Sequence, residues 1–282
     1  MPEVPLQFDA IIVAGGRGSR LGGVIKADLE VGGQRLLDRV LAAARHAQQR
    51  VVVGLVDVPE GVRQVTEDPP GSGPAAGLVA GLDAIADPSE WTLVLACDLP
   101  GAERAVPQLL AAAIAGGDAD GHCLGSADGT PQWLLGIHRS DALRQAAADY
   151  GDARQRSVRG LMAQMRLVVV ADTDDVGHDV DTWSDYEHWD ARWRRTVRTE
   201  HENWQRFVDD ACTAVGIDPS LVDIGAVLDM TREVAHAGAR PMAPISAYIL
   251  GLAVGDPDAD PEYLRRVIED AATAAPVPQE DS

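Results

Sequence analysis

The chain has 282 residues, a formal net charge of −20 at pH 7 and a hydrophobic fraction of 46%. This length can bury the core of one large domain or of two ordinary ones, and the hydrophobic fraction excludes wholesale disorder. The negative charge argues against a general nucleic-acid binder, because most of the surface would repel a polyanion.

The first residues, MPEVPLQFDAIIVAGG, lack a basic segment, so their apolar stretch indicates a strand rather than a signal peptide. No apolar run approaches the ~20 residues that span a bilayer, and we expect no membrane partner. The three cysteines, Cys97, Cys123 and Cys212, lie far apart without metal-ligand spacing. A reducing, cytoplasmic location is therefore expected.

Apolar runs alternate with segments of helical spacing through the first two thirds of the chain. Residues 9–14 (DAIIVA) form the first predicted strand, which ends in a glycine-rich loop, and residues 35–48 form the first predicted helix. Strands are then expected at 51–56, 61–67, 92–96, 119–124, 131–137 and 167–170, with helices at 73–85, from Ala102 to Gly116 and from Ser140. This alternation predicts an α/β fold with three layers and a Rossmann-like, mostly parallel sheet.

The pattern changes at about residue 195. The segments 199–215, 219–237, 241–254 and 260–275 all have helical spacing, with no strand between them. Asp218-Pro219 and Asp260-Pro261 are typical of an N-cap followed by a proline in the first turn. We therefore expect an α/β domain over residues 1–195 and a small all-α domain over residues 196–282.

The loop after the first strand, AGGRGSRLGGVIK, is suited to bind phosphate groups. The glycines leave backbone N–H groups open to an anion, and Lys26 is the only lysine of the chain. A lysine in such a loop offers a compact, rotatable ammonium group, although a chance solvated lysine is the alternative. The loop lacks GxxxxGK[ST] and breaks GxGxxG at its last position, so a Walker-type ATPase and a dinucleotide enzyme are both unsupported.

Two aspartates follow predicted strands further along. Asp98, in LVLACDLP, lies just past the carboxyl end of an apolar strand, where open α/β sheets bind ligands. Its hard oxygens suit Mg²⁺, and the alternative is an aspartate that caps a turn. Asp68, in TEDPPGSGPAAGL, could join the metal site or contact a nucleotide, or it could be a turn residue before proline.

A cluster of acidic residues near residue 175 lacks EF-hand spacing, and a solvated loop is the better interpretation. Its members are Asp172, Asp174, Asp175, Asp179 and Asp181. The histidines are scattered, so a zinc centre is not supported.

Taken together, residues 10–190 resemble the MobA-like nucleotidyltransferases, the group that contains molybdenum cofactor guanylyltransferase. The family opens with a strand and then L-A-G-G-x-S-x-R-M/L-G-x-D-K, which stands here as VAGGRGSRLGGVIK. Its magnesium-binding D-x-P motif is matched by Asp98-Leu99-Pro100, and its acidic residue before P-L-A/G-L is matched by Asp68. Its late N-T-P segment appears as Asp181-Thr182-Trp183.

The chain departs from the family pattern at three places. Ile25 replaces the usual acid before the lysine, Gly54 or Leu55 stands where asparagine is frequent, and Asp181 replaces asparagine. The C-terminal helical segment is similar to an uncharacterised module of some actinobacterial relatives, and the resemblance assigns it no activity.

The resemblance implies transfer of GMP from GTP to molybdopterin, with release of pyrophosphate and with Mg²⁺ held by Asp98. Lys26, Arg20 and Asp98 are the expected catalytic residues. The expected nucleotide-binding residues are Val13, Ala14, Gly15, Gly16, Arg17, Gly18, Lys26, Asp68 and Asp98.

Two alternatives to this function stay open at this point. A molybdopterin cytidylyltransferase, or an enzyme for another small phosphate acceptor, would use the same scaffold. A module that delivers molybdenum cofactor to molybdoenzymes or to biosynthesis proteins is the alternative of another class. Its basis is the group Trp189, Trp193 and Trp204 near the domain junction, which could also simply pack the interface.

Overall fold

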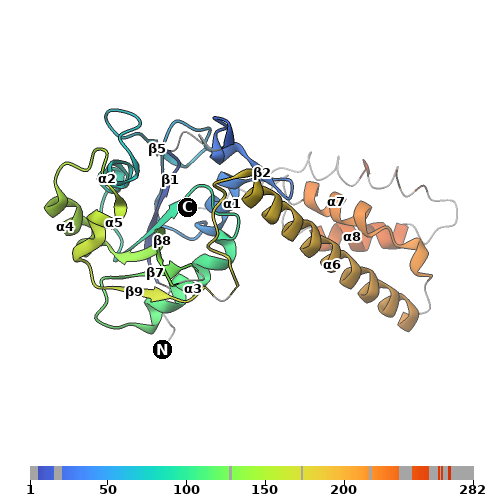
Figure 1. The fold of residues 1–282 in the computed structure, drawn as a ribbon. Helices are drawn as coiled ribbons and strands as arrows, with labels where there is room; N and C mark the ends of the chain where they lie inside the picture. The colour runs from blue at the N-terminus through green and yellow to red at the C-terminus, as the bar shows by residue number, and fades with distance from the viewer. Residues whose placement is uncertain are drawn as a thin grey trace, which may run out of the picture. The chain divides into compact units, whose positions relative to one another are not determined.

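The computed structural model describes residues 6–15, 21–126, 129–172, 174–215, 218–234 and 243–253, together with 260, 262, 266 and 267. The chain divides into two compact units, Met1–Thr196 and Val197–Ser282. The first unit contains a seven-stranded sheet with helices on both faces (Figure 1).

The order of the strands in this sheet is β5-β4-β1-β6-β8-β7-β9. The strands are β1 (Phe8–Val13), β4 (Arg50–Val53), β5 (Arg63–Val65), β6 (Trp91–Ala96), β7 (Gly121–Gly125), β8 (Pro131–Arg139) and β9 (Leu167–Val170). All neighbours pair in parallel except β8, which is antiparallel to both β6 and β7. The predicted mostly parallel sheet is confirmed. β8 reverses because the short loop after β7 leaves no room for the crossover that a parallel strand needs.

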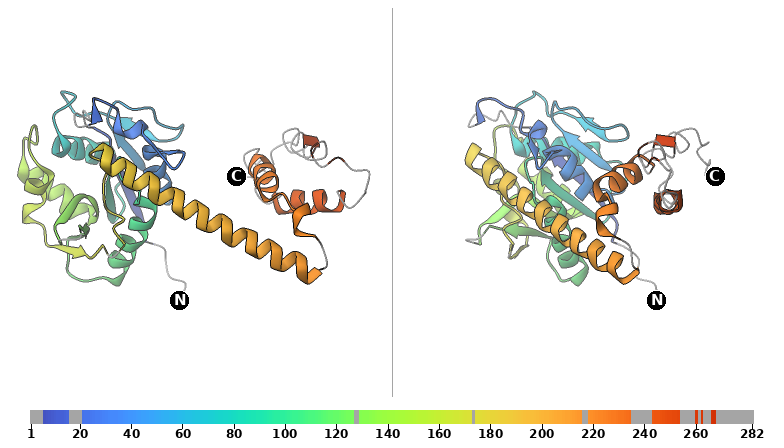
Figure 2. Two further views of the ribbon diagram at one scale, coloured as in Figure 1. Left: turned by 45° about the vertical axis from the view of Figure 1, so that its right-hand side comes forward. Right: turned by 90° about the vertical axis from the view of Figure 1, so that its right-hand side faces the viewer.

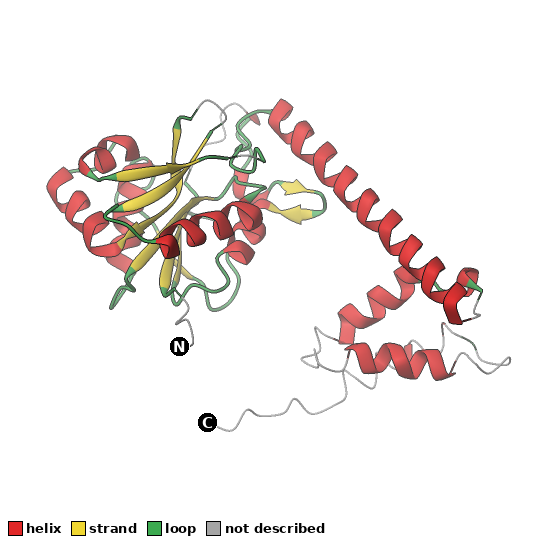
Figure 3. Ribbon diagram, turned by 90° about the horizontal axis from the view of Figure 1, so that it is seen from below, coloured by secondary structure: helices red, strands yellow, loops and turns green. Residues whose placement is uncertain are grey.

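Helices cover the two faces of the sheet and complete the predicted three layers (Figure 3). One face carries α1 (Leu36–Ala43) and α3 (Ala102–Ala115), and the other carries α2 (Pro74–Ala84), α4 (Ser140–Tyr150) and α5 (Val158–Leu161). β1 is buried along its whole length, with Ile12 facing one core and Ile11 facing the other. This is the pattern that a continuous apolar run predicts for a central strand.

Two local features differ from the sequence expectation. The helix expected to reach residue 48 ends at Ala43, because Gln48 and Gln49 pair with the backbone of β1. A small hairpin, β2 (Glu30–Val31) and β3 (Gln34–Arg35), was not predicted. Its turn is Gly32-Gly33, and both glycines have positive φ, which a two-residue hairpin of this kind requires.

The helix expected from residue 199 begins much earlier. α6 spans Trp183–Val215, 33 residues, and Figure 2 shows it as one unbroken helix. Thr182 and Asp185 cap its start reciprocally, since Asp185 N donates to Thr182 Oγ1 and Thr182 N donates to Asp185 Oδ2. Trp189 is buried within the first unit, in a cluster with Leu21, Leu29, Val31, Leu36 and Val180. The side chain of Trp204 lies outside the described part of the chain.

In the second unit the structure describes α7 (Ile224–Val234), α8 (Ala243–Ala253) and a 3-10 turn, η4 (Pro219–Leu221). Asp218 caps η4 as predicted, by accepting a hydrogen bond from Ser220 N at 2.9 Å. The helix expected over 219–237 is interrupted, because Asp223 accepts from Ala226 N and starts α7 anew. Most of 260–275 lies outside the described residues. Among the helices described, none combines the length and apolar character needed to cross a membrane.

A histidine is enclosed at the centre of the sheet. His138 on β8 is fully buried, and neither ring nitrogen has a hydrogen-bond partner among the residues that the structure describes. The ring fits only because its neighbours are glycines, since a Cβ on Gly121 or Gly136 would lie 2.3 Å or 2.8 Å from a ring nitrogen. Burial, and to a lesser extent His122, lowers the pKa of His138 to about 3.

This burial predicts an acid-sensitive fold. The folded protein keeps His138 neutral, whereas the unfolded chain takes up a proton at this residue near pH 6.5. The stability that depends on neutral His138 is therefore complete above pH 6.5 and is lost as the pH falls towards 3. Between pH 7.5 and pH 5 the loss should be about 2 kcal/mol. His138→Phe, which cannot titrate, should remove this part of the pH dependence. Urea denaturation of both proteins at the two pH values checks it, and an identical pH dependence would contradict it.

Candidate functional site

The candidate site lies where two neighbouring parallel strands end together. β1 and β6 pair in register, with Val13 opposite Ala96, and Cys97 N donates to Val13 O at 3.1 Å to extend the pairing. After β1 the chain crosses towards β4, whereas after β6 it crosses towards β7. Such a switch of direction opens a crevice at the carboxyl ends of the strands.

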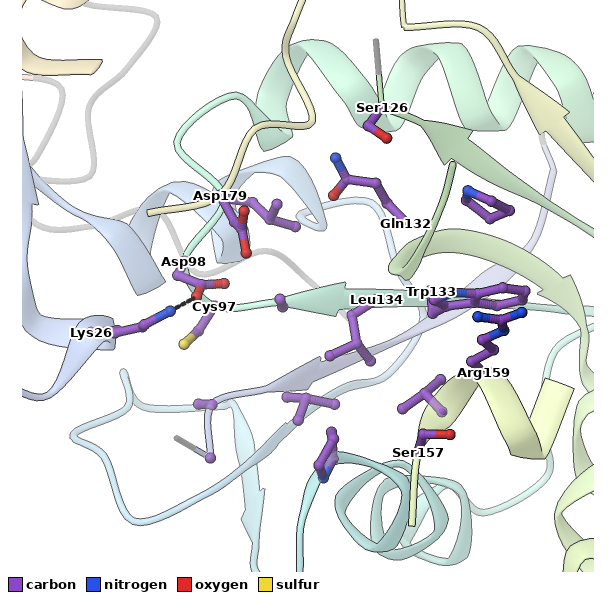
Figure 4. Close-up of a pocket in the computed structure, with 18 of the residues that line it drawn as sticks. Lys26, Cys97, Asp98, Ser126, Gln132, Trp133, Leu134, Ser157, Arg159 and Asp179 are labelled. Atoms are coloured by element: carbon purple, nitrogen blue, oxygen red, sulfur yellow. Dashed lines mark hydrogen bonds and ion pairs between the residues drawn. The ribbon is translucent and has the colours of Figure 1, made fainter. Parts of the chain in front are cut away.

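A lysine lies between two carboxylates in this crevice. Figure 4 shows its bond to one of them, that of Asp98. Lys26 Nζ donates to Asp98 Oδ2 at 2.6 Å and also to Asp181 Oδ1. Burial by itself would lower the pKa of Lys26, but the charge of Asp98 and the hydrogen bond to Asp181 outweigh it, so this pKa lies above its usual value. The ammonium group therefore keeps its charge throughout the physiological range.

A third carboxylate, that of Asp179, completes the cluster. Single oxygens of Asp98, Asp179 and Asp181 all lie within 4.8 Å of one another. Burial, together with the charges of Asp98 and Asp181, raises the pKa of Asp179. Three carboxylates facing one ammonium group leave an excess of negative charge, and their hard oxygens are the ligands that divalent cations such as Mg²⁺ prefer. The residues present therefore fit a divalent metal ion.

The start of α6 holds these aspartates in place. Val180 N donates to the backbone oxygen of Asp98 at 3.0 Å, which ties this segment to the end of β6. Asp185, in the first turn of α6, accepts hydrogen bonds from the backbone N–H of Asp181 and Thr182. Asp181 thus stays beside Asp98 because the helix cap and the bond of Val180 fix the backbone there, and Asp179 directly precedes Val180.

The solvated-loop interpretation of the acidic cluster is wrong for Asp179 and Asp181. It is confirmed for Asp174 and Asp175, which are exposed. The carboxylate of Asp172 accepts hydrogen bonds within the loop, from Val176 N and Gly177 N. Spacing could not have separated these groups, because Asp172 and Asp174 are also two residues apart.

The first of two hollows in the crevice has a volume of about 500 Å³. Lys26, Asp98 and Asp179 lie at one end of it (Figure 4). Because β8 is antiparallel, its first residues stand beside the carboxyl end of β6 and close the other end. This other end is lined by Ser126, Thr130, Gln132, Trp133, Ser157 and Arg159.

The second hollow has a volume of about 660 Å³ and shares Val13, Ala14 and Gly15 with the first. Gly54 lies on its wall with φ 145°, and a Cβ there would come 2.8 Å from Ala14 O. Only glycine permits this close approach of β4 to the end of β1. Gly54 thus stands where the family often has asparagine. Because it has no side chain, the backbone itself forms the wall of the second hollow at this point.

Five of the predicted site residues line the first hollow, namely Val13, Ala14, Gly15, Lys26 and Asp98. The predicted Gly16, Arg17, Gly18 and Arg20 lie outside the described residues.

Asp68 is not brought together with Asp98 in the structure. It is exposed and lines a third hollow beside Arg154, whereas the neighbouring Glu67 is buried and lines both that hollow and the crevice. Cys97 also lines the first hollow, but burial raises its pKa far above the usual value, so its thiol stays neutral.

A lysine among carboxylates at the switch point of a mostly parallel sheet defines the class of α/β proteins that bind nucleotides and transfer phosphorus groups. Sequence comparison specifies the family. The MobA-like NTP transferase domain matches residues 10–176, more than half of the chain, and the chain therefore belongs to this family of nucleotidyltransferases. A domain of unknown function, DUF6457, matches residues 199–281.

Two relatives illustrate the similarity. The molybdenum cofactor guanylyltransferase of Acidiphilium cryptum (strain JF-5) is 33% identical over 190 residues, which cover 63% of this chain and 91% of that protein. The molybdenum cofactor guanylyltransferase of Pseudomonas putida (strain GB-1) is 32% identical over 106 residues, which cover 36% of this chain and about half, 54%, of that protein.

Solved structures share the fold of the first unit. The homologue of Mycobacterium tuberculosis rv0371c from Mycobacterium sp. strain JC1 aligns with a TM-score of 0.52 and 25% identity, over 67% of this chain and 97% of that chain. The 2-C-methyl-D-erythritol 4-phosphate cytidylyltransferase of Thermus thermophilus aligns with a TM-score of 0.50 and 19% identity, over 67% and 99% of the two chains. The latter similarity concerns the fold alone.

The lysine should hold the three carboxylates together against their mutual repulsion. Lys26→Met should lower the free energy of unfolding by about 1–2 kcal/mol, because the nearly buried Asp98 loses its charged partner, whereas water screens the more exposed Asp181. Adding Asp181→Asn removes one of the repelling charges and should recover part of the loss. Urea denaturation in the presence of a chelator measures both effects. Unchanged stability of Lys26→Met, or no recovery in the double variant, would refute this account.

Proposed function

We propose that this protein transfers GMP from GTP to molybdopterin and releases pyrophosphate. The observation that carries the proposal is the ion pair of Lys26 with Asp98 and Asp181, located at the switch-point crevice of a MobA-like domain. The names of the relatives support this choice of nucleotide and acceptor, above all that of the Acidiphilium cryptum protein, which the match covers over 91% of its length.

The chemical step needs positioning and charge neutralisation rather than covalent catalysis. A phosphate oxygen of the acceptor attacks the α-phosphorus of GTP and forms the new P–O bond. The bond from the α-phosphorus to the bridging oxygen breaks, and its electron pair leaves with pyrophosphate. An acceptor phosphate is already ionised near neutral pH, so no side chain has to remove a proton.

Lys26 is the charged group that we assign to the triphosphate. Its raised pKa keeps the ammonium protonated, so it can neutralise the charge that develops on the leaving pyrophosphate. Gly15 begins the loop that we propose as the phosphate cradle. Gly16, Arg17, Gly18 and Arg20 continue it by sequence, and Asp68 remains a proposed nucleotide contact on the motif match alone.

Asp98 is the proposed Mg²⁺ ligand, and Asp179 and Asp181 are suited to share the ion. When bound, the ion would act as a Lewis acid and neutralise charge on phosphate oxygens. The protein's own contribution is a set of oxygens at fixed positions, since Val180 holds the backbone of Asp98 and the cap of α6 holds that of Asp181. A negative cluster of this kind would repel an anionic acceptor that arrived without compensating cations.

In this proposal, the two hollows bind different parts of the substrates. The second hollow has mostly glycine and apolar walls, which suit a nucleobase. The first hollow extends past the carboxylates to Gln132 and Trp133, which offer an amide and an aromatic surface to the acceptor. Gly15 is shared by both hollows, and the α-phosphate then lies on its Lys26 side, in the first hollow.

The assay that tests the function is pyrophosphate release with GTP, CTP, ATP and UTP, each with and without molybdopterin. Lys26→Ala and Asp98→Asn should each lower kcat by at least about 100-fold, the usual effect of removing one group that stabilises transition-state charge. Arg45→Ala and Asp118→Asn remove exposed charges that line neither hollow, and they should leave the rate unchanged.

Each alternative function gives a different result in this assay. Release that requires CTP would identify a cytidylyltransferase. Release without molybdopterin would indicate hydrolysis with water as the acceptor, and no release with any of the four nucleotides would favour an enzyme for another acceptor. Tight molybdopterin binding without any turnover would favour a delivery module that serves molybdoenzymes. Full activity of Lys26→Ala would remove the lysine from the mechanism.

A further inference from the structure

The second hollow contains one charged side chain among the described residues that line it, that of Glu67. Glu67 follows β5, is 8% exposed, and its Oε1 accepts a hydrogen bond from Gly71 N at 2.8 Å. A Cβ on Gly15 would lie 3.8 Å from the same oxygen, so the carboxylate lies directly beside the start of the loop that follows β1.

The described walls of the second hollow suit a neutral ligand better than a phosphate group. The other walls consist of glycines, of apolar side chains such as Ile25 and Leu55, and of the uncharged Thr66 and Gln155. A phosphate placed there would face a negative charge with no described cation on the wall. A neutral ring that carries hydrogen-bond donors is the ligand that fits an apolar slot with one acceptor group.

The turn that carries Glu67 is braced on several sides. Ser72 Oγ donates to Pro69 O at 2.6 Å, and Gln155 N donates to Ser72 O at 2.7 Å. Gln155 Nε2 also donates to Gly71 O at 3.0 Å. These bonds fix the backbone of residues 69–72, and the hydrogen bond from Gly71 N then fixes the orientation of the carboxylate. A group that is oriented before the ligand arrives loses little freedom on binding.

We infer that Glu67 selects guanine by accepting hydrogen bonds from its N1–H and N2–H₂ groups, an inference that rests on the proposed function. A carboxylate only accepts hydrogen bonds. Guanine presents two donors side by side on its pairing edge, whereas cytosine and adenine each present one donor next to an acceptor. Uracil presents one donor between two acceptors. Within the described residues no hydrogen bond occupies Glu67 Oε2, and Oε1 retains a second lone pair.

The test compares Glu67→Gln with the unchanged protein on three nucleotides. GTP offers both donors, ITP lacks the N2 amino group, and XTP carries a carbonyl oxygen in its place. Glutamine keeps an oxygen for Gly71 N but turns an NH₂ donor towards the base. Isothermal titration with each nucleotide in the presence of Mg²⁺ measures binding without any acceptor.

The unchanged protein should bind GTP at least about tenfold more tightly than ITP, since a hydrogen bond to a charged group contributes that much. In Glu67→Gln the GTP affinity should fall at least about tenfold, the ratio of GTP to ITP affinity should approach one, and XTP should become the preferred nucleotide. Glu60→Gln makes the same chemical change at an exposed loop position outside both hollows, and should bind all three nucleotides like the unchanged protein.

The outcomes separate the two claims. In one outcome, the unchanged protein binds GTP and Glu67→Gln shows the same ratio of GTP to ITP affinity as the unchanged protein. That result overturns the role of Glu67 and leaves the proposed function intact. An equal loss of affinity for all three nucleotides in Glu67→Gln also overturns it, because it indicates a structural role. Preference of the unchanged protein for CTP over GTP instead overturns the guanylyl assignment itself.

Discussion

The ammonium group of Lys26 connects parts of the chain that are distant in sequence, since its two partners lie 72 and 155 residues away. Asp98 belongs to the end of β6 and Asp181 to the segment before α6. Without a cation between them, these carboxylates and that of Asp179 would repel one another across a few ångströms. The geometry of the crevice therefore depends on this one charge, and the backbone bond from Val180 to Asp98 maintains the same arrangement from behind.

The crevice separates two kinds of chemistry. On one side of Gly15 the groups are ionic, with the lysine and three aspartates, and on the other the walls are glycine and apolar side chains with a single carboxylate. The separation follows from topology. β4 and β5 supply the small residues on one side, while β6 and the antiparallel β8 supply the other side. A nucleotide, which has a flat ring at one end and charged phosphates at the other, matches this division.

Local signals in the sequence accounted for much of the fold. The apolar runs of β1 and β6 predicted central strands, and the positions of Gly15 and Asp98 just after them predicted where a ligand would bind. Asp179 and Asp181 could not be placed in this way, because their position depends on a helix cap at Thr182 and on pairing with a distant strand end. Glu67 and Asp68 are adjacent acids in one turn, and only the folded backbone determines which of them faces inward.

The environment of Lys26 also determines how the protein reacts with electrophiles. As the chain has no other lysine, its single ε-amine is enclosed by aspartates and held in the protonated form, which is not nucleophilic. Reagents that acylate amines will therefore find few reactive groups on this molecule beyond the N-terminus. A triphosphate bound to this ammonium group would keep it protonated and would cover it, so acylation at this one position should slow further when the crevice is occupied.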